Sequence, residues 1–278
     1  MKWINIAKMM LLTGAAGAVL AAAGCGGDQA ASSAAESGKK VVKVAHTAYY
    51  FPYDFVDDNN KSDGLEVAVM KEVEKKLPQY EFQYVPISDD DLLIGVESGK
   101  YDIGTKGIWK TPKNNIGASV IGVTIRSEDA NTIKNLDDFA KAGKKLVPIA
   151  PQNAQYQVVT DYNAAHPDHP IDLEASENFE IADAYSWVLE GRYDGYFSIE
   201  LAYQKNVTAK DAPYGQFKDK LTYFRYKALP TYALVNKKET KLAEEVDKAL
   251  GELKKEGKIA ELEKKYFGEE LDLLLDKQ

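Results

Sequence analysis

Runs of β-branched and aromatic residues alternate with amphipathic segments of helical period along most of this chain. The runs at 40–45 and 80–85 have the composition of strands. Between them, the segment 66–77 places Val69 and Leu77 among the apolar residues of one helical face. A strand–helix–strand order of this kind favours a mainly parallel sheet covered by helices. The sequence therefore predicts an α/β fold.

The same alternation continues almost to the C-terminus, and Asn135 has the position of a helix N-cap. Further strands are predicted at 101–105, 119–126, 145–149, 171–175, 193–197, 221–226 and 231–235. Further helices are predicted at 91–98, 135–141, 155–163, 181–190, 241–256 and 259–267. A chain that builds two α/β units and then returns to strand fits two lobes joined by two crossing strands. The cleft between such lobes is a common ligand site.

The N-terminus differs in kind from the rest of the chain. Lys2 and Lys8 accompany an uncharged apolar run at 9–23, which is short for a membrane span and has the form of a signal-peptide core. Small residues precede Cys25 in a pattern that resembles a bacterial lipobox, although Ala22 stands where leucine is usual. We expect cleavage before Cys25 and its diacylation, because two acyl chains give stable anchoring.

Cys25 is the only cysteine, which excludes a disulfide within the chain. A buried structural thiol is the alternative, but the small, polar stretch at 26–38 that follows favours lipidation and a flexible tether. The formal net charge of −8 and the mixture of Lys and Glu argue against nucleic acid as a partner.

Several short stretches match one family in their order and spacing, although none is specific alone. They are 64–67 (GLEV), 99–103 (GKYDI), 110–112 (KTP), 133–139 (IKNLDDF), 191–195 (GRYDG), 236–237 (NK), 257–258 (GK) and 264–268 (KKYFG). Over about 40–270 the chain resembles the family-3 extracellular solute-binding proteins, the receptors of polar amino-acid ABC importers. The segment 162–171 looks most like the cystine and sulfur-amino-acid branch.

The resemblance implies a type II periplasmic binding protein fold, in which two α/β lobes close on a ligand about hinge strands near 120–123 and 229–232. It also implies a monomer that works with a permease and ATPase subunits and carries no cofactor. The predicted divisions are 1–24 for the signal peptide, 25–39 for the tether, 40–121 and 232–270 for lobe 1, 122–231 for lobe 2, and 271–278 for a C-terminal tail.

The chain departs from the family at the two charged anchors that hold an amino acid. In the family, an arginine after the Thr-Pro step grips the carboxylate, and the matching position here is Asn114. An aspartate normally meets the ammonium group, and the matching position is Ile199, with Glu200 beside it. A modified amino acid, a short peptide and an organic cation therefore remain open as ligands.

Aromatic and basic residues of the first half are candidates for the ligand site. Tyr50 stands where the family stacks an aromatic ring on the ligand, with core packing as the alternative. Trp109 is suited to cover a ligand face or a cation, or else lies buried in its lobe. Lys106, like Lys110 and Arg126, offers a positive charge in place of the missing arginine, and a solvated surface position is the alternative.

Gln152 and Asn153 open a predicted helix whose free N–H groups suit an anionic group of a ligand. Asn153 alternatively serves only as the N-cap. Glu200 is the remaining acid near the ammonium position, or else an acid that the helix dipole favours. His166 and His169 lack a third strong ligand nearby, so we expect no metal.

The predicted function is that of a substrate-binding lipoprotein of an ABC importer in the cell envelope. It would capture a small polar solute, an amino acid or a cystine-like derivative, in the cleft between the lobes. One alternative is a dehydratase or lyase on the same fold, with Glu200 or Asp194 as general acid. Another is a sensing or adhesion lipoprotein that has lost solute binding.

Overall fold

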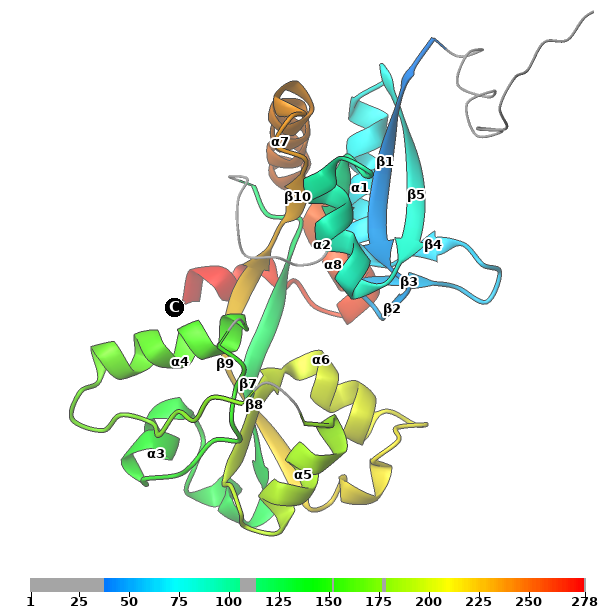
Figure 1. The fold of residues 1–278 in the computed structure, drawn as a ribbon. Coiled ribbons are helices and arrows are strands. Elements are labelled where there is room, and N and C mark those ends of the chain that lie inside the picture. The colour runs from blue at the N-terminus through cyan, green and yellow to red at the C-terminus, as the bar shows by residue number, and fades with distance from the viewer. Residues whose placement is uncertain (1–37, 106–113, 152, 177–178, 278) are drawn as a thin grey trace, which may run out of the picture. The chain divides into compact units, whose positions relative to one another are not determined.

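The computed structural model of the protein describes residues 38–105, 114–151, 153–176 and 179–277 (Figure 1). Of the residues singled out in the sequence, Cys25, Lys106, Trp109, Lys110 and Gln152 lie outside this described part.

The first sheet has four strands in the order β10-β6-β1-β5. β1 (Lys40–Thr47) runs parallel to β5 (Tyr80–Ile87) and to β6 (Ile103–Thr105), as the sequence predicts. β10 (Ala233–Val235) joins the far edge in the antiparallel direction. The C-terminal part of the chain therefore completes a sheet that the N-terminal part begins.

Helices with one apolar face bury this first sheet. α1 (Leu65–Lys76), α7 (Thr240–Lys255) and α8 (Lys258–Phe267) contribute side chains to one core with β1 and β5. α2 (Asp89–Ser98) covers a smaller cluster. We call this sheet and its helices the first lobe.

The aromatic segment after β1 folds as a small antiparallel sheet and not as the loop that its proline predicts. Its strands are β2 (Tyr49–Tyr50), β3 (Asp54–Val56) and β4 (Ser62–Asp63). The proline is accommodated because Pro52 lies in the turn between β2 and β3, where no ladder hydrogen bond is required.

The last sheet is antiparallel, in the order β8-β7-β9. β7 (Gly117–Arg126) pairs with β8 (Gly195–Ile199) on one side and β9 (Leu221–Thr231) on the other. The predicted strands at 145–149 and 171–175 form only isolated parallel bridges. Pro148 interrupts the first of them and removes a ladder donor.

Helices on this sheet complete what we call the second lobe. They are α3 (Leu136–Lys141), α4 (Ala154–Ala165), α5 (Ile181–Leu189) and α6 (Glu200–Tyr203). The side chain of Asn135 accepts a hydrogen bond from the backbone of Asp138, which confirms the predicted N-cap of α3. Four short helical segments lie at Ser127–Asn131, Gln204–Thr208, Gly215–Phe217 and Asp272–Lys277.

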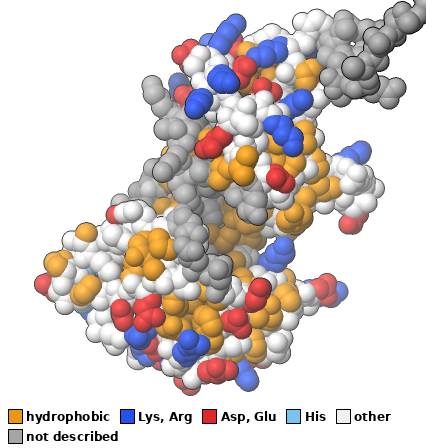
Figure 2. All heavy atoms as spheres, viewed as in Figure 1, with side chains coloured by type: hydrophobic (Ala, Val, Ile, Leu, Met, Phe, Trp, Pro, Cys, Tyr) orange, Lys and Arg blue, Asp and Glu red, His pale blue; other side chains and the backbone are white. Residues whose placement is uncertain are grey.

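The face of the molecule in Figure 2 carries charged side chains around areas of hydrophobic ones. Lys, Arg, Asp and Glu side chains are interspersed over the face in Figure 2, so no basic patch stands out on it. Within the described ranges, no helix has both the length and the apolar character needed to cross a membrane.

Asp54 of β3 and Glu66 at the start of α1 form a buried carboxyl pair in the first lobe, with exposed fractions of 0% and 1%. The Thr105 hydroxyl donates a hydrogen bond of 2.9 Å to Asp54 Oδ2. Burial raises the pKa of Glu66 to about 7. Burial and the neighbouring Glu66 charge also raise the pKa of Asp54. The folded protein therefore binds a proton here more tightly than the unfolded chain does.

Glu66→Gln is expected to reduce the pH dependence of stability. In the native protein, the contribution of Glu66 is full below about pH 4.5 and is lost as the pH rises through about 7. The free energy of unfolding should therefore be roughly 1 to 3 kcal/mol higher at pH 5.5 than at pH 8. Urea unfolding at both pH values measures this difference, which should be smaller in the variant.

Glu97→Gln is the matched control, because Glu97 is exposed on α2. It should keep the native pH dependence. An equal dependence in native protein and Glu66→Gln would contradict a role for the buried pair.

Candidate functional site

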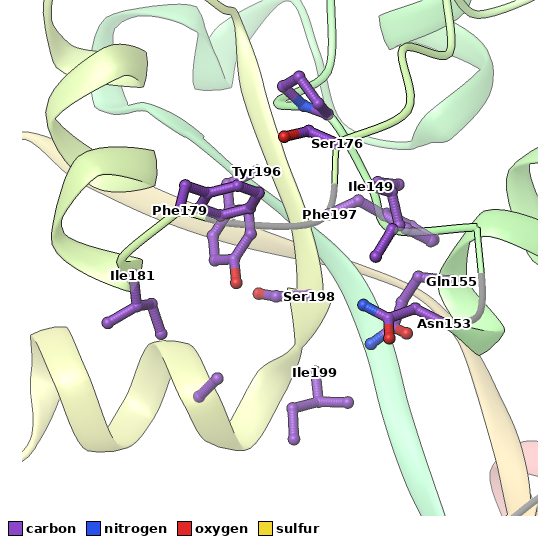
Figure 3. A pocket seen from close by; sticks show the side chains of 13 residues that line it. Ile149, Asn153, Gln155, Ser176, Phe179, Ile181, Tyr196, Phe197, Ser198 and Ile199 are labelled. Carbon is purple, nitrogen blue, oxygen red and sulfur yellow. The ribbon is translucent and has the colours of Figure 1, made fainter.

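A pocket of about 270 Å³ lies in the second lobe, where β8 ends and the helices begin (Figure 3). Its lining comes from the segment after α3, from the starts of α4 and α5, and from β8 with α6. The lining residues are Pro148, Ile149, Ala150, Asn153, Gln155, Ser176, Phe179, Ile181, Tyr196, Phe197, Ser198, Ile199 and Ala202. We call this hollow the β8 pocket.

Two helix N-termini open onto the β8 pocket. Asn153 is the N-cap of α4, and Ile181 is the first residue of α5. Neither helix has a side-chain hydrogen bond at its N-cap. The first backbone N–H groups of a helix have no partner within the helix, and they carry a partial positive charge. These two helices therefore present hydrogen-bond donors to whatever enters the pocket.

Apolar side chains make part of the wall. The rings of Phe179 and Tyr196 meet edge to face with their centroids 6.3 Å apart. Phe197 is 2% exposed and belongs to the core of the second lobe together with Ile149. The wall thus offers contact surface to a group that is partly apolar.

Polar side chains interrupt this wall. Ser198 is 4% exposed, and its Oγ has no hydrogen-bond partner among the described residues. Figure 3 shows it between Tyr196 and the amide side chains of Asn153 and Gln155. A buried hydroxyl without a partner is costly, which is a reason to expect that a bound molecule supplies one.

None of the thirteen described lining residues carries a charge. The β8 pocket can therefore make hydrogen bonds and apolar contacts, but its described wall offers no ion pair to a ligand.

Two of the positions singled out in the sequence meet in this pocket, namely Asn153 and Ile199. Tyr50 belongs to the first lobe, where its ring stacks on that of Tyr53 at 5.0 Å and the side chain is 37% exposed. Whether Tyr50 contacts a ligand stays a prediction.

Asn114 is held against α7 of the first lobe. Its side-chain amide donates to the backbone oxygen of Asp247 at 3.0 Å, and its own N–H donates to Asp247 Oδ1 at 2.9 Å. It lines a separate hollow with Asp247 and Gly251. These contacts give Asn114 a structural role in joining the chain to α7.

The Glu200 carboxylate accepts a hydrogen bond from an arginine of β9. Arg225 Nε donates to Glu200 Oε1 at 2.8 Å, and Arg225 Nη1 donates to Glu269 Oε2 at 3.1 Å. The hydrogen bond from Arg225 lowers the pKa of Glu269. Glu200 lines a small hollow with Tyr53 and Leu271 rather than the β8 pocket.

Asp194 and Arg126 form a second charged group at the base of the second lobe. Arg126 Nη2 lies 2.8 Å from Asp194 Oδ1, and Lys144 Nζ lies 3.1 Å from the same oxygen. Burial alone would raise the pKa of Asp194, but hydrogen bonds from the Lys145 N–H, Arg126 and Lys144 lower it below its ordinary value. Arg126 is therefore engaged within the protein and does not line the β8 pocket.

The two histidines take part in local packing. The ring of His166 stacks on Tyr162 with centroids 4.2 Å apart, and His169 Nε2 lies 2.8 Å from Asp137 Oδ1. Among the described residues, no group of three or more His, Cys, Asp and Glu is placed to hold a metal ion.

The sequence did not identify three of the lining residues as parts of the site, namely Ser198, Tyr196 and Phe179. The predicted strand ends at residue 197, one residue before Ser198. Continuing the strand alternation would have placed Tyr196 and Ser198 on the same face. Phe179 follows a segment without periodicity, so no sequence signal pointed to it.

The family model for bacterial extracellular solute-binding proteins, family 3, matches residues 42–269. The L-cystine-binding protein TcyJ of Bacillus subtilis (strain 168) is 25% identical over 230 residues, which cover 77% of this chain and 79% of the relative. The L-cystine-binding protein TcyA of the same organism is 24% identical over 240 residues, which cover 84% of this chain and 83% of the relative.

Solved structures show the same fold. The probable amino-acid ABC transporter extracellular-binding protein ytmK from Bacillus subtilis superposes with a TM-score of 0.64 at 20% identity, covering 83% of this chain and 98% of its own. A structure from work on glutathione import via GshT and the cystine ABC importer TcyBC of Streptococcus mutans superposes with a TM-score of 0.61 at 21% identity. The match covers 84% of this chain and 97% of the other. These neighbours confirm the predicted type II periplasmic binding protein fold.

The family match spans all three sheets, from β1 to the residues after α8. The chain therefore belongs to the bacterial extracellular solute-binding proteins, family 3.

Proposed function

We propose that this protein is the substrate-binding component of an ABC importer and that it captures an amino acid or a cystine-like derivative. The observation that carries the proposal is the family match over residues 42–269, together with relatives at 24–25% identity that are named L-cystine-binding proteins. The β8 pocket adds a preformed hollow with a hydroxyl that has no partner among the residues the structure describes, which favours retained solute binding over its loss.

The acids offered for a dehydratase or lyase are poorly placed for proton transfer. A general acid has to hold a proton near the working pH and release it to the substrate. The low pKa of Asp194 leaves it ionised, and Glu200 is ion-paired with Arg225. Neither residue lines the β8 pocket. These contacts favour a receptor over an enzyme.

The hinge of this receptor would lie in β7 and β9, the two strands that carry the chain from the first lobe to the second and back. Their pairing, which changes register between Ile121 and Gly122, supports the division into 40–121 with 232–270 and 122–231. Closure of the two lobes around the solute would be the state that the permease recognises, and the receptor would act as a monomer.

Thermal unfolding of the mature chain without its lipid-carrying Cys25 (26–278) tests the receptor proposal. A ligand at one hundred times its dissociation constant stabilises a fold by about 2.7 kcal/mol, which raises Tm by about 5 °C or more. We expect such a shift with L-cystine or one of its derivatives. A shift only with sugars or other solutes would retain the receptor but remove the amino-acid assignment.

The N-terminal segment completes the proposal. Cys25 would carry the lipid that holds the receptor at the outer face of the membrane, with residues 25–39 as its tether. This placement supports capture of a solute close to the permease.

Cys25→Ser is expected to abolish incorporation of labelled fatty acid when the full chain is expressed in a bacterial host. The control is Cys25→Ser with Ser32→Cys, which keeps one cysteine but moves it away from the small residues that precede position 25. Both variants should remain unlabelled and the native chain labelled. Label on the control would mean that any exposed cysteine is acylated, which would contradict the lipobox assignment.

A further inference from the structure

We propose that the C-terminal residues 269–275 form a splint that crosses the hinge and limits the range of lobe separations that the receptor samples without ligand. Arg225 is the residue through which this splint holds the second lobe. The inference rests on the hinge proposed above in β7 and β9, and it is independent of the identity of the solute.

The hinge strands contain an irregularity, and this is where we expect them to flex. Ile121 of β7 pairs with Lys227 of β9, and the next residue, Gly122, pairs with Arg225. Tyr226 is therefore an additional residue on β9. An additional residue of this kind disrupts the ladder locally and lets the strand bend. A contact that spans the irregularity restricts the hinge more than a contact on one side of it.

Polar contacts fasten the splint to the first lobe. Glu270 Oε2 lies 2.9 Å from Lys264 Nζ of α8. The backbone N–H of Asp272 donates to Glu263 Oε2 of α8 at 3.0 Å, and Asp272 Oδ2 lies 2.9 Å from Lys254 Nζ of α7. These contacts hold the segment on two helices of that lobe.

An apolar contact seats the splint on the hinge strands at the first-lobe side of the irregularity. Leu271 is 3% exposed and packs with Ala118 and Val120 of β7 and with Ala228 of β9. Figure 1 shows the C-terminal segment, in red, beside these two strands. Lifting the segment from this seat would expose apolar surface to water, which opposes its detachment.

Arg225 lies at the other side of the irregularity, and its guanidinium holds two carboxylates. Nε donates to Glu200 Oε1 at 2.8 Å, and Nη2 lies 2.8 Å from Glu200 Oε2. Nη1 donates to Glu269 Oε2 at 3.1 Å, and Nη2 donates to Glu269 Oε1. Pairing at two points fixes the orientation of each carboxylate against the arginine.

This geometry separates the ion triad from an ordinary surface ion pair. A single exposed pair contributes little, whereas pairs with two-point geometry that form a network contribute more. The Glu200 side chain is also only 18% exposed. Glu200 begins α6 and directly follows Ile199, which lines the β8 pocket. The splint therefore reaches from α7 and α8 of the first lobe to the wall of that pocket.

Distances between spin labels, measured by pulsed electron paramagnetic resonance, test the splint on residues 26–278, which contain no cysteine of their own. Glu97→Cys on α2 and Ala164→Cys on α4 place one label at an exposed position of each lobe. Without ligand, Glu269→Gln should broaden the distribution of label-to-label distances, because it releases Arg225 from the C-terminal segment.

Glu270→Gln is the matched control. It makes the same change of charge at the adjacent residue, but it removes only the pair with Lys264 inside the first lobe. The distribution of distances should stay as narrow as in the labelled parent protein. Equal broadening by Glu269→Gln and Glu270→Gln would overturn the proposal, because it would mean a general loosening of the C-terminal segment.

Arg225→Gln shows whether Arg225 and Glu269 act through each other. It should broaden the distribution as well, and adding Glu269→Gln to it should cause no further broadening. Unchanged distributions in both single variants would overturn the splint. In that case, a shift of the parent protein's distance on addition of L-cystine would still leave the receptor function in place, because lobe closure is observed separately.

Discussion

The pairing of β7 with β9 is the interaction on which the rest of the structure depends. The two strands are joined from Gly117 opposite Thr231 to Arg126 opposite Leu221, with an irregularity in the register after Ile121. A side chain at Gly122 would collide with the Phe224 carbonyl oxygen, so the close approach at this irregularity requires glycine. Because β8 pairs with β7, the position of the β8 pocket follows from this ladder.

The C-terminal residues reinforce the same strands. Leu271 packs with Ala118, Val120 and Ala228 in a small apolar cluster on β7 and β9. Arg225 of β9 bridges Glu200 of the second lobe and Glu269 beyond α8. Apolar contacts and an ion triad thus meet at the crossing strands, while the β8 pocket beside them keeps a neutral described lining. The ion pairs of Arg225 thus join β9 to α6 and to the residues after α8.

The sequence was a good guide to the helices and to the first sheet, because amphipathic period and β-branched runs are local signals. The segments that became α1, α7 and β1 were all found, and so was the cap at Asn135. The sequence did not predict the antiparallel direction of β7, β8 and β9, since strand direction depends on which distant segments pair. Pairing is a tertiary property that a single run such as 145–149 does not encode.

The site was harder to predict for the same reason. Asn153 and Ile199 were singled out through the family resemblance, and the structure brings them to one pocket. Ser198 of β8 and Phe179, which precedes α5, come to the pocket only through folding. Asn114 looked like a ligand position in the sequence, but its hydrogen bonds to Asp247 were not foreseeable from residues 133 positions apart.

Hydrogen exchange of the mature chain, with and without a saturating ligand, tests the central claim most directly, because the backbone N–H groups at the start of α4 and α5 are themselves the expected contacts. The account predicts slower exchange at the first amides of the two helices, those of residues 154–155 and 181–182. Protection confined to other parts of the chain, with these amides unchanged, would contradict the assignment of the β8 pocket as the place where the solute binds.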